Sequence, residues 1–233
     1  ENIYFGKPCG LMDQMACSTG SLVYIDFKNP KAPIVEKIPF DMECYGYSLC
    51  ITDTKGSHAD LTDEYAAVPE EMKRVARCFE KEVLVDVSFD ALLENITEIR
   101  EKTSDRCVLR ALHFLAENKR VEKEVSVLKE GNIAEFFATV KASGDSSYKY
   151  LQNVYSVKDI HQQNVSVALA VSEMVLADNG VCRVHGGGFA GTIQAFVKNE
   201  AVKEYQGYMN QIYGAGACSV FKIRNYGGLL VID

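Results

Sequence analysis

One carboxylate, Asp13, is the side chain in this sequence whose surroundings best suit chemistry. It follows a segment that contains Gly6, Pro8 and Gly10, and it falls in the first turn of a helix predicted over residues 11–19. Glycine frees the backbone and proline fixes it, so this segment predicts a constrained turn. A carboxylate near a helix start stays ionised and is a weak base, which phosphoryl transfer tolerates because orienting the attacking hydroxyl matters most there. The plain alternative, which the residues alone favour, is that Asp13 only stabilises the helix start.

A glycine-rich segment far along the chain, Gly-Gly-Gly-Phe-Ala-Gly over residues 186–191, is the second candidate. It lies between two predicted strands, and its backbone N–H groups can line a phosphate or a sugar because glycines permit close approach. The alternative is a tight turn that needs glycine only for its positive φ, and an isolated run fits that equally well. Taken with Asp13, the segment predicts one site built from both ends of the chain.

The hydrophobic periodicity predicts the elements that position these residues. Strands are expected over residues 22–26, 34–38, 47–52, 181–184, 192–197 and 218–223, with a further edge over 229–232. Helices are expected over 58–79 with a break or kink at Pro69, over 107–128, after the cap Asn132, over 158–178 ending at Asn179–Gly180, and over 201–213. Strands early, helices in the middle and strands late indicate an α+β fold.

Composition narrows the classes of partner. The 233 residues carry a net charge of −7, which argues against nucleic acid or an anionic membrane as a partner. The longest apolar run, residues 165–177, is too short and too polar to span a bilayer and is typical of a buried helix. Eight cysteines are scattered without a Cys-x-x-Cys pair, which fits neither a zinc site nor a disulfide framework and predicts a cytoplasmic location.

Several motifs together resemble the galactokinases of the GHMP small-molecule kinase superfamily, and the resemblance runs along the whole chain. They are Pro-Cys-Gly-Leu-Met-Asp-Gln over 8–14, Leu-Cys-Ile-Thr-Asp-Thr over 49–54, Glu64-Tyr65, Asp105-Arg106 and the glycine segment 186–191. The resemblance implies an α+β GHMP-kinase carboxy-terminal domain over residues 45–233, with an antiparallel sheet packed against helices. Residues 1–44 would be a remnant of the amino-terminal domain, and its face is expected to expose apolar surface.

The resemblance also implies a function and residue roles. The function is phosphoryl transfer from ATP, with Mg²⁺, to the O1 hydroxyl of galactose. Asp13 would orient that hydroxyl and accept its proton, while Cys9, Gly10, Tyr65 and Gly187 would bind the sugar. Gly186, Gly187 and Gly188 would complete the site beside the nucleotide phosphates, and no metal ligand is expected in this chain. Tyr65 fits a core position on its helix equally well.

This sequence departs from the pattern of the resemblance at three positions. His185 stands where a small hydroxyl residue is usual and adds bulk at the pocket edge, and Gly144 takes the place of a frequent histidine. Ala190 replaces a glycine and is tolerated if its φ is negative. Asp53 falls where the family has the end of a strand of the sugar pocket, and it is a weak candidate for a sugar-binding residue. Arg106 is expected to have a structural rather than a catalytic role. His58, His113 and His161 are expected to be surface or packing residues rather than ligands.

The family elements that bind the ATP phosphates and Mg²⁺, and one that binds the sugar, have no counterpart in these 233 residues. In a galactokinase these elements lie in the amino-terminal two fifths of the protein. They are a glycine- and serine-rich phosphate loop, the Mg²⁺-binding serine and acid, and a further sugar-binding segment. We therefore expect a carboxy-terminal portion that is inactive alone and whose partners are the missing amino-terminal portion, galactose and ATP. The alternatives are a non-catalytic sugar-sensing or interaction protein, or a kinase for a related hexose such as N-acetylgalactosamine.

Overall fold

The computed structural model describes residues 3–4, 10–57 and 61–229. The strands are β1 (Leu22–Asp26), β2 (Ile34–Ile38), β3 (Tyr47–Asp53), β4 (Gly180–Val184), β5 (Thr192–Lys198) and β6 (Cys218–Phe221). The helices are α1 (Met12–Thr19), α2 (Thr62–Cys78), α3 (Phe89–Glu94), α4 (Ile96–Lys102), α5 (Asp105–Lys129), α6 (Ile133–Ser146), α7 (Asn164–Leu176) and α8 (Val202–Tyr213).

The strands form two antiparallel sheets. One has the order β4-β5-β3-β6, so β3 from the start of the chain lies between β5 and β6 from its end. The other is the hairpin β1-β2, with Leu22 opposite Ile38. The predicted α+β class, with an antiparallel sheet packed against helices, is confirmed. The predicted division at residue 44 stays a prediction.

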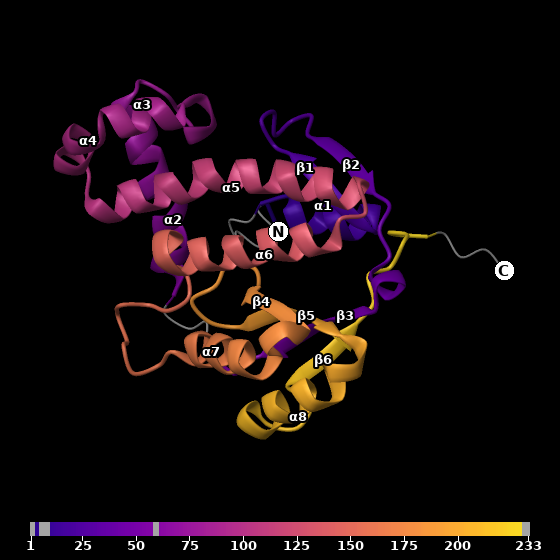
Figure 1. Ribbon diagram of the computed structural model, residues 1–233. Coiled ribbons are helices and arrows are strands. Elements are labelled where there is room, and N and C mark those ends of the chain that lie inside the picture. The colour runs from indigo at the N-terminus through magenta and orange to yellow at the C-terminus, as the bar shows by residue number, and fades with distance from the viewer. Residues whose placement is uncertain (1–2, 5–9, 58–60, 230–233) are drawn as a thin grey trace.

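Helices cover both faces of the four-stranded sheet, with α5 and α6 on one side and α7 and α8 on the other (Figure 1). Strand alternation explains this, because neighbouring residues of a strand point to opposite faces. Leu49 and its partner Phe196 belong to the core with α5 and α6, whereas Cys50 and its partner Ala195 belong to the core with α7 and α8. The period-two pattern of β3 and β5 therefore fixes a three-layer arrangement.

Helix α2 runs without interruption through Pro69, so the predicted break does not occur, whereas the alternative of a kink stays a prediction. Proline removes one backbone hydrogen bond and crowds the preceding turn. The packing of Val75 and Ala76, both completely buried, against α5 offsets that cost. Tertiary contact, which a local pattern does not contain, therefore keeps the helix continuous.

Helix α7 differs from its prediction at both ends. It begins at Asn164 rather than residue 158, and it ends at Leu176 before a short 3-10 turn. The left-handed residue at that end is Ala177, with φ of 44°, and Gly180 is extended and already in β4. A Cβ on Gly180 would lie 2.3 Å from the carbonyl oxygen of Phe196, so glycine serves the approach of β4 to β5 rather than a helix cap.

The expectation that residues 165–177 form a buried helix is correct for one face of α7 only. Ser172 is buried and bonds to the hydroxyl of Tyr205 at 2.9 Å, whereas Val167 and Met174 are exposed by 50% and 81%. Within the described residues, no helix has the length and apolar character needed to cross a membrane. Helices α3 and α4 were not predicted. The predicted edge over 229–232 is not a strand at Leu229, and residues 230–232 lie outside the described residues.

Apolar side chains are exposed on α1 and β2, as expected for residues 1–44. Leu11, Met12 and Ile34 are exposed, and α1 contains no buried residue. Asn132 caps α6 as predicted, since its side chain accepts a hydrogen bond from the N–H of Glu135 at 3.2 Å.

Candidate functional site

The glycine loop, residues 185–191, is the tip of the hairpin between β4 and β5. Gly186, Gly188 and Gly191 have positive φ, and so does Phe189 at 58°. The φ angle of Ala190 is not positive, so an alanine fits the backbone where the family has a glycine. The loop reverses the chain through left-handed positions, which glycine occupies at little cost.

Two of the glycines are also required by close packing. A Cβ on Gly188 would lie 1.9 Å from the carbonyl oxygen of Asn153, and one on Gly187 would lie 2.8 Å from the ring of Tyr65. No side chain fits at Gly188 without moving backbone. The loop is therefore pressed against α2 and the segment that follows α6.

Hydrogen bonds fix the loop in this position. The hydroxyl of Tyr65 donates to the carbonyl of Gly188 at 2.7 Å, and the N–H of Phe189 donates to the carbonyl of Asn153 at 2.5 Å. The side-chain amide of Asn153 donates to the carbonyl of Gly187 at 3.2 Å. Burial raises the pKa of Tyr65, which keeps the hydroxyl protonated and able to donate. Tyr65 therefore positions the loop, and its contact with a sugar stays a prediction.

Asp13 is exposed in the first turn of α1, as predicted. The far end of this helix is held by the end of the chain, because the N–H of Ser21 donates to the carbonyl of Arg224 at 2.6 Å. Gly10 is exposed, and a side chain there would meet nothing within 4 Å, while Cys9 lies outside the described residues. The carboxylate of Asp13 is thus presented from a short helix whose far end is held by a segment late in the chain.

His185 connects the two candidate motifs. Its Nδ1 is 2.9 Å from the hydroxyl of Thr192 across the hairpin. Surrounding protein atoms, and then the guanidinium of Arg183, lower the pKa of His185, while the negative charge of Asp13 acts in the opposite direction. Asp13 therefore lies close enough to act electrostatically on the base of the glycine loop. That the two motifs form one site, with the bulk of His185 at its edge, stays a prediction.

The structure also accounts for Gly144, which departs from the family pattern, and for the surroundings of Asp53. A Cβ on Gly144 would lie 2.8 Å from the Cβ of Arg183, so a histidine would collide with β4. Arg183 uses the space to donate to the hydroxyl of Ser143 at 2.6 Å. Asp53 pairs with the ammonium of Lys55 at 2.7 Å on the surface.

The remaining candidates lie in packing networks. Arg106 donates to Glu71 at 2.5 Å, which supports the expected structural role, and Arg110, completely buried, donates to the same carboxylate at 2.9 Å. His113 is buried, and its Nδ1 is 2.9 Å from the hydroxyl of Ser146. Burial lowers the pKa of His113 to about 4, so it is neutral at pH 7. His161 is exposed, and His58 lies outside the described residues.

Sequence reasoning missed two residues that hold the loop. Asn153 is 4% exposed in an irregular segment, and Thr54 is completely buried. The N–H and the hydroxyl of Thr54 both donate to the carbonyl of Gly191, at 2.8 and 2.7 Å. No local pattern marks either residue, because each acts on a backbone group far away in the sequence. Within the described residues, no cluster of three or more His, Cys, Asp or Glu side chains could hold a metal ion.

Comparison with known proteins found no family model that matches the chain, but it found relatives among the galactokinases. The chain is 26% identical over 203 residues to a galactokinase from Actinobacillus pleuropneumoniae, covering 87% of this chain and 50% of that protein. It is 28% identical over 210 residues to the galactokinase of Streptomyces coelicolor (87% and 49%), and 29% identical over 211 residues to that of Thermotoga maritima (87% and 55%). The chain thus spans about half the length of the curated relatives it matches.

Two solved structures share the fold. Galactokinase from Lactococcus lactis, complexed with galactose, matches with a TM-score of 0.72 at 21% identity, covering 97% of this chain and 57% of that one. Mevalonate kinase from L. major, in complex with R-mevalonate, matches with a TM-score of 0.54 at 14% identity, covering 97% and 55%. The resemblance to galactokinases is confirmed.

Proposed function

We propose that this chain, which corresponds to the carboxy-terminal portion of a galactokinase, supplies the sugar-positioning side of an ATP-dependent galactose 1-kinase. The observation that carries the proposal is the galactokinase fold, in which Asp13 is exposed in the first turn of α1 and Tyr65 and Asn153 hold the glycine loop. A carboxylate and a loop of backbone N–H groups, brought from opposite ends of the sequence, form the pairing that orients a hydroxyl beside phosphate groups.

In the proposed reaction, the O1 oxygen of galactose attacks the γ-phosphorus of ATP, and the bond to the β,γ-bridging oxygen breaks to release ADP. The hydroxyl proton passes to the carboxylate of Asp13. Because the transition state of phosphoryl transfer is loose, Asp13 acts mainly by orienting the hydroxyl.

The glycine loop supplies shape rather than charge. Tyr65 and Asn153 hold its carbonyl groups from behind. The loop therefore keeps its form when a ligand binds, and this pre-organisation lowers the entropic cost of orienting the sugar.

ATP and Mg²⁺ are expected for the family, but the described residues do not form a dedicated cation site. Mg²⁺ is usually held by one or two carboxylates together with substrate phosphates. We derive no step through the ion, and we propose that ATP is gripped by the part of the relatives' length that this chain does not span. The 233 residues alone are then expected to be inactive.

A second candidate is a non-catalytic sugar sensor. The hydroxyl of Tyr65 is already bonded to Gly188, and His185 adds bulk at the site's edge, which favours altered sugar recognition. The same bulk leaves a kinase for a related hexose, such as N-acetylgalactosamine, as a variant of the main proposal. We also propose a cytoplasmic location for this protein, supported by the free thiols of the described cysteines.

The test is ADP release with galactose and Mg-ATP, using this chain and a version extended by its own upstream coding sequence to the length of the relatives. We expect activity in the extended protein only, and a loss of about 10²-fold or more in kcat for Asp13→Ala. Asp90→Ala is the matched control, because Asp90 is an exposed acid in the first turn of α3. An extended protein that folds and binds galactose but releases no ADP with any hexose would support the sensor instead.

A further inference from the structure

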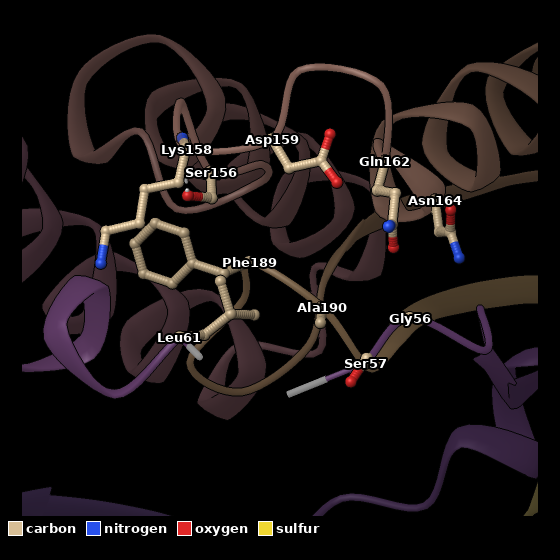
Figure 2. A pocket seen from close by; sticks show the side chains of 10 residues that line it. All are labelled: Gly56, Ser57, Leu61, Ser156, Lys158, Asp159, Gln162, Asn164, Phe189 and Ala190. Carbon is tan, nitrogen blue, oxygen red and sulfur yellow. Dashed lines mark hydrogen bonds between the residues drawn. The ribbon is translucent and has the colours of Figure 1, made fainter. Parts of the chain in front are cut away.

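A separate cavity of about 280 Å³ lies beside the glycine loop, between the start of α2, the turns over 156–163 and the start of α7 (Figure 2). Asp13, Tyr65 and Gly187 do not line it. The cavity is thus lined by a different set of side chains from those assigned to the proposed kinase site, although Phe189 and Ala190 of the glycine loop contribute to it.

The floor of the cavity is apolar. It is formed by Phe189 and Ala190, each 6% exposed, with Leu61 beside them. The ring of Phe189 packs edge-on against the ring of Tyr65 at 5.3 Å between centroids. The methyl group of Ala190, which departs from the glycine of the family pattern, therefore contributes to a surface that suits the apolar face of a small ring.

The rim of the cavity is polar and keeps unused hydrogen-bonding capacity. One carboxylate oxygen of Asp159 accepts from the N–H of His161 at 3.0 Å, which leaves the second oxygen. The side chain of Gln162 has no hydrogen bond within the described part of the chain, and the amide group of Asn164 donates to the carbonyl of Thr54 at 3.0 Å, which leaves its oxygen. Figure 2 shows the Asp159 and Gln162 side chains directed toward the space over Phe189 and Ala190.

The charges of the lining residues select against an anion. The ammonium of Lys158 is paired with Asp63 at 3.0 Å, and the carboxylate of Asp159 faces the cavity. A neutral ligand that donates hydroxyl groups to carboxylate and amide oxygens, and rests one apolar face on the floor, satisfies both surfaces. We infer that this cavity binds a neutral cyclic polyol of about monosaccharide size, as a second site beside the glycine loop.

Saturation-transfer NMR on the 233-residue chain tests this site, with galactose, glucose and myo-inositol as probes. At least one probe should give a signal that persists in Asp13→Ala, because that substitution alters only the proposed kinase site. Gln162→Ala and Asp159→Asn should each weaken the apparent affinity roughly five- to tenfold, the effect of one lost hydrogen bond. Gln211→Ala, an exposed glutamine on α8, is the matched control and should leave the affinity unchanged.

Two results would overturn the inference. One is the absence of a signal from all three probes at tens of millimolar concentration. The other is a signal that disappears in Asp13→Ala and is indifferent to Gln162→Ala, which would place the sugar in the kinase site. Failure of the kinase assay leaves this measurement intact, so the two proposals fail separately. Thermal unfolding of each variant confirms that a lost signal does not reflect a lost fold.

Discussion

Among single residues, Glu124 has a perturbed environment that the proposed site does not explain. It lies on α5 and faces a space shared with the β1-β2 hairpin and the sheet, where Arg183 and Gln194 are also found. Burial, and then the charge of Glu117, raise the pKa of Glu124 to about 7, and the opposing influence of Arg183 and Arg120 is weaker. Glu124 therefore holds a proton in the folded protein near neutral pH and loses it in the unfolded chain.

The sign of the pH dependence follows from this difference. Because the folded state binds the proton more tightly, ionised Glu124 costs stability above about pH 7, and the cost disappears as the pH falls toward the unfolded value of about 4.5. Glu124→Gln should raise the free energy of unfolding at pH 8 by about 1 to 2 kcal/mol and change it little at pH 5. Urea denaturation at both values measures this. Glu122→Gln, an exposed neighbour on α5, is the control, and equal effects of the two substitutions would contradict the assignment.

At the scale of elements, the hairpin between β4 and β5 is placed by contacts that come from outside it. Tyr65 on α2, Asn153 after α6 and Thr54 after β3 each bond to a carbonyl of the loop. Three segments that are far apart in the sequence are therefore joined by hydrogen bonds to this one loop. Its glycines differ in purpose, because some provide only positive φ and others leave room for these neighbours.

A comparison of two glycines separates those purposes. Gly186 has φ of 67° with open space around it, whereas Gly188 has φ of 81° and faces the carbonyl of Asn153. Gly186→Ala should cost about 1 to 2 kcal/mol of stability from backbone strain alone. Gly188→Ala should cost roughly 1 to 3 kcal/mol more, because backbone must move. Urea denaturation gives both values, and equal losses would show that the contact with Asn153 is not rigid.

At the scale of the whole molecule, a segment early in the chain contacts a segment late in the chain. The segment 224–228 lies against the end of α1, so a Cβ on Gly227 would be 1.7 Å from the carbonyl of Ser18, and one on Gly20 would be 2.2 Å from the backbone of Tyr226. Because α1 has no buried residue of its own, this backbone contact and β1 hold the helix that carries Asp13. The position of the proposed catalytic carboxylate thus depends on residues more than 200 positions away.

Gly227→Ala is expected to detach the end of the chain from α1 and to lower stability by about 1 to 3 kcal/mol, because neither backbone can yield cheaply. Hydrogen exchange should show faster exchange of the α1 amides with the β3-β5 amides unchanged. Gly228→Ala is the matched control, since a side chain there meets nothing within 4 Å. Equal exchange rates in the two variants would show that β1 alone positions α1.

Sequence patterns predicted most of the elements correctly and proposed the residues of the candidate site, whose roles stay predictions. Period-two and helical spacings predicted the strands and the longer helices within a few residues, because burial of one face leaves a regular apolar pattern. The turn chemistry around Asp13 and the glycine run pointed to two motifs from local rules alone. The galactokinase motifs then indicated the fold, and the structural matches agree with it.

Tertiary structure decided what local patterns do not encode. It kept α2 continuous through Pro69, used Gly180 for strand approach instead of a helix cap, and left one face of α7 exposed. It also assigned the hydroxyl of Tyr65 to the loop and revealed Asn153 and Thr54 as its supports. Each outcome depends on a contact between segments far apart in the chain, whose energy exceeds a local preference of about 1 kcal/mol. The sequence therefore specified the chemical groups, and the packing specified which of them meet.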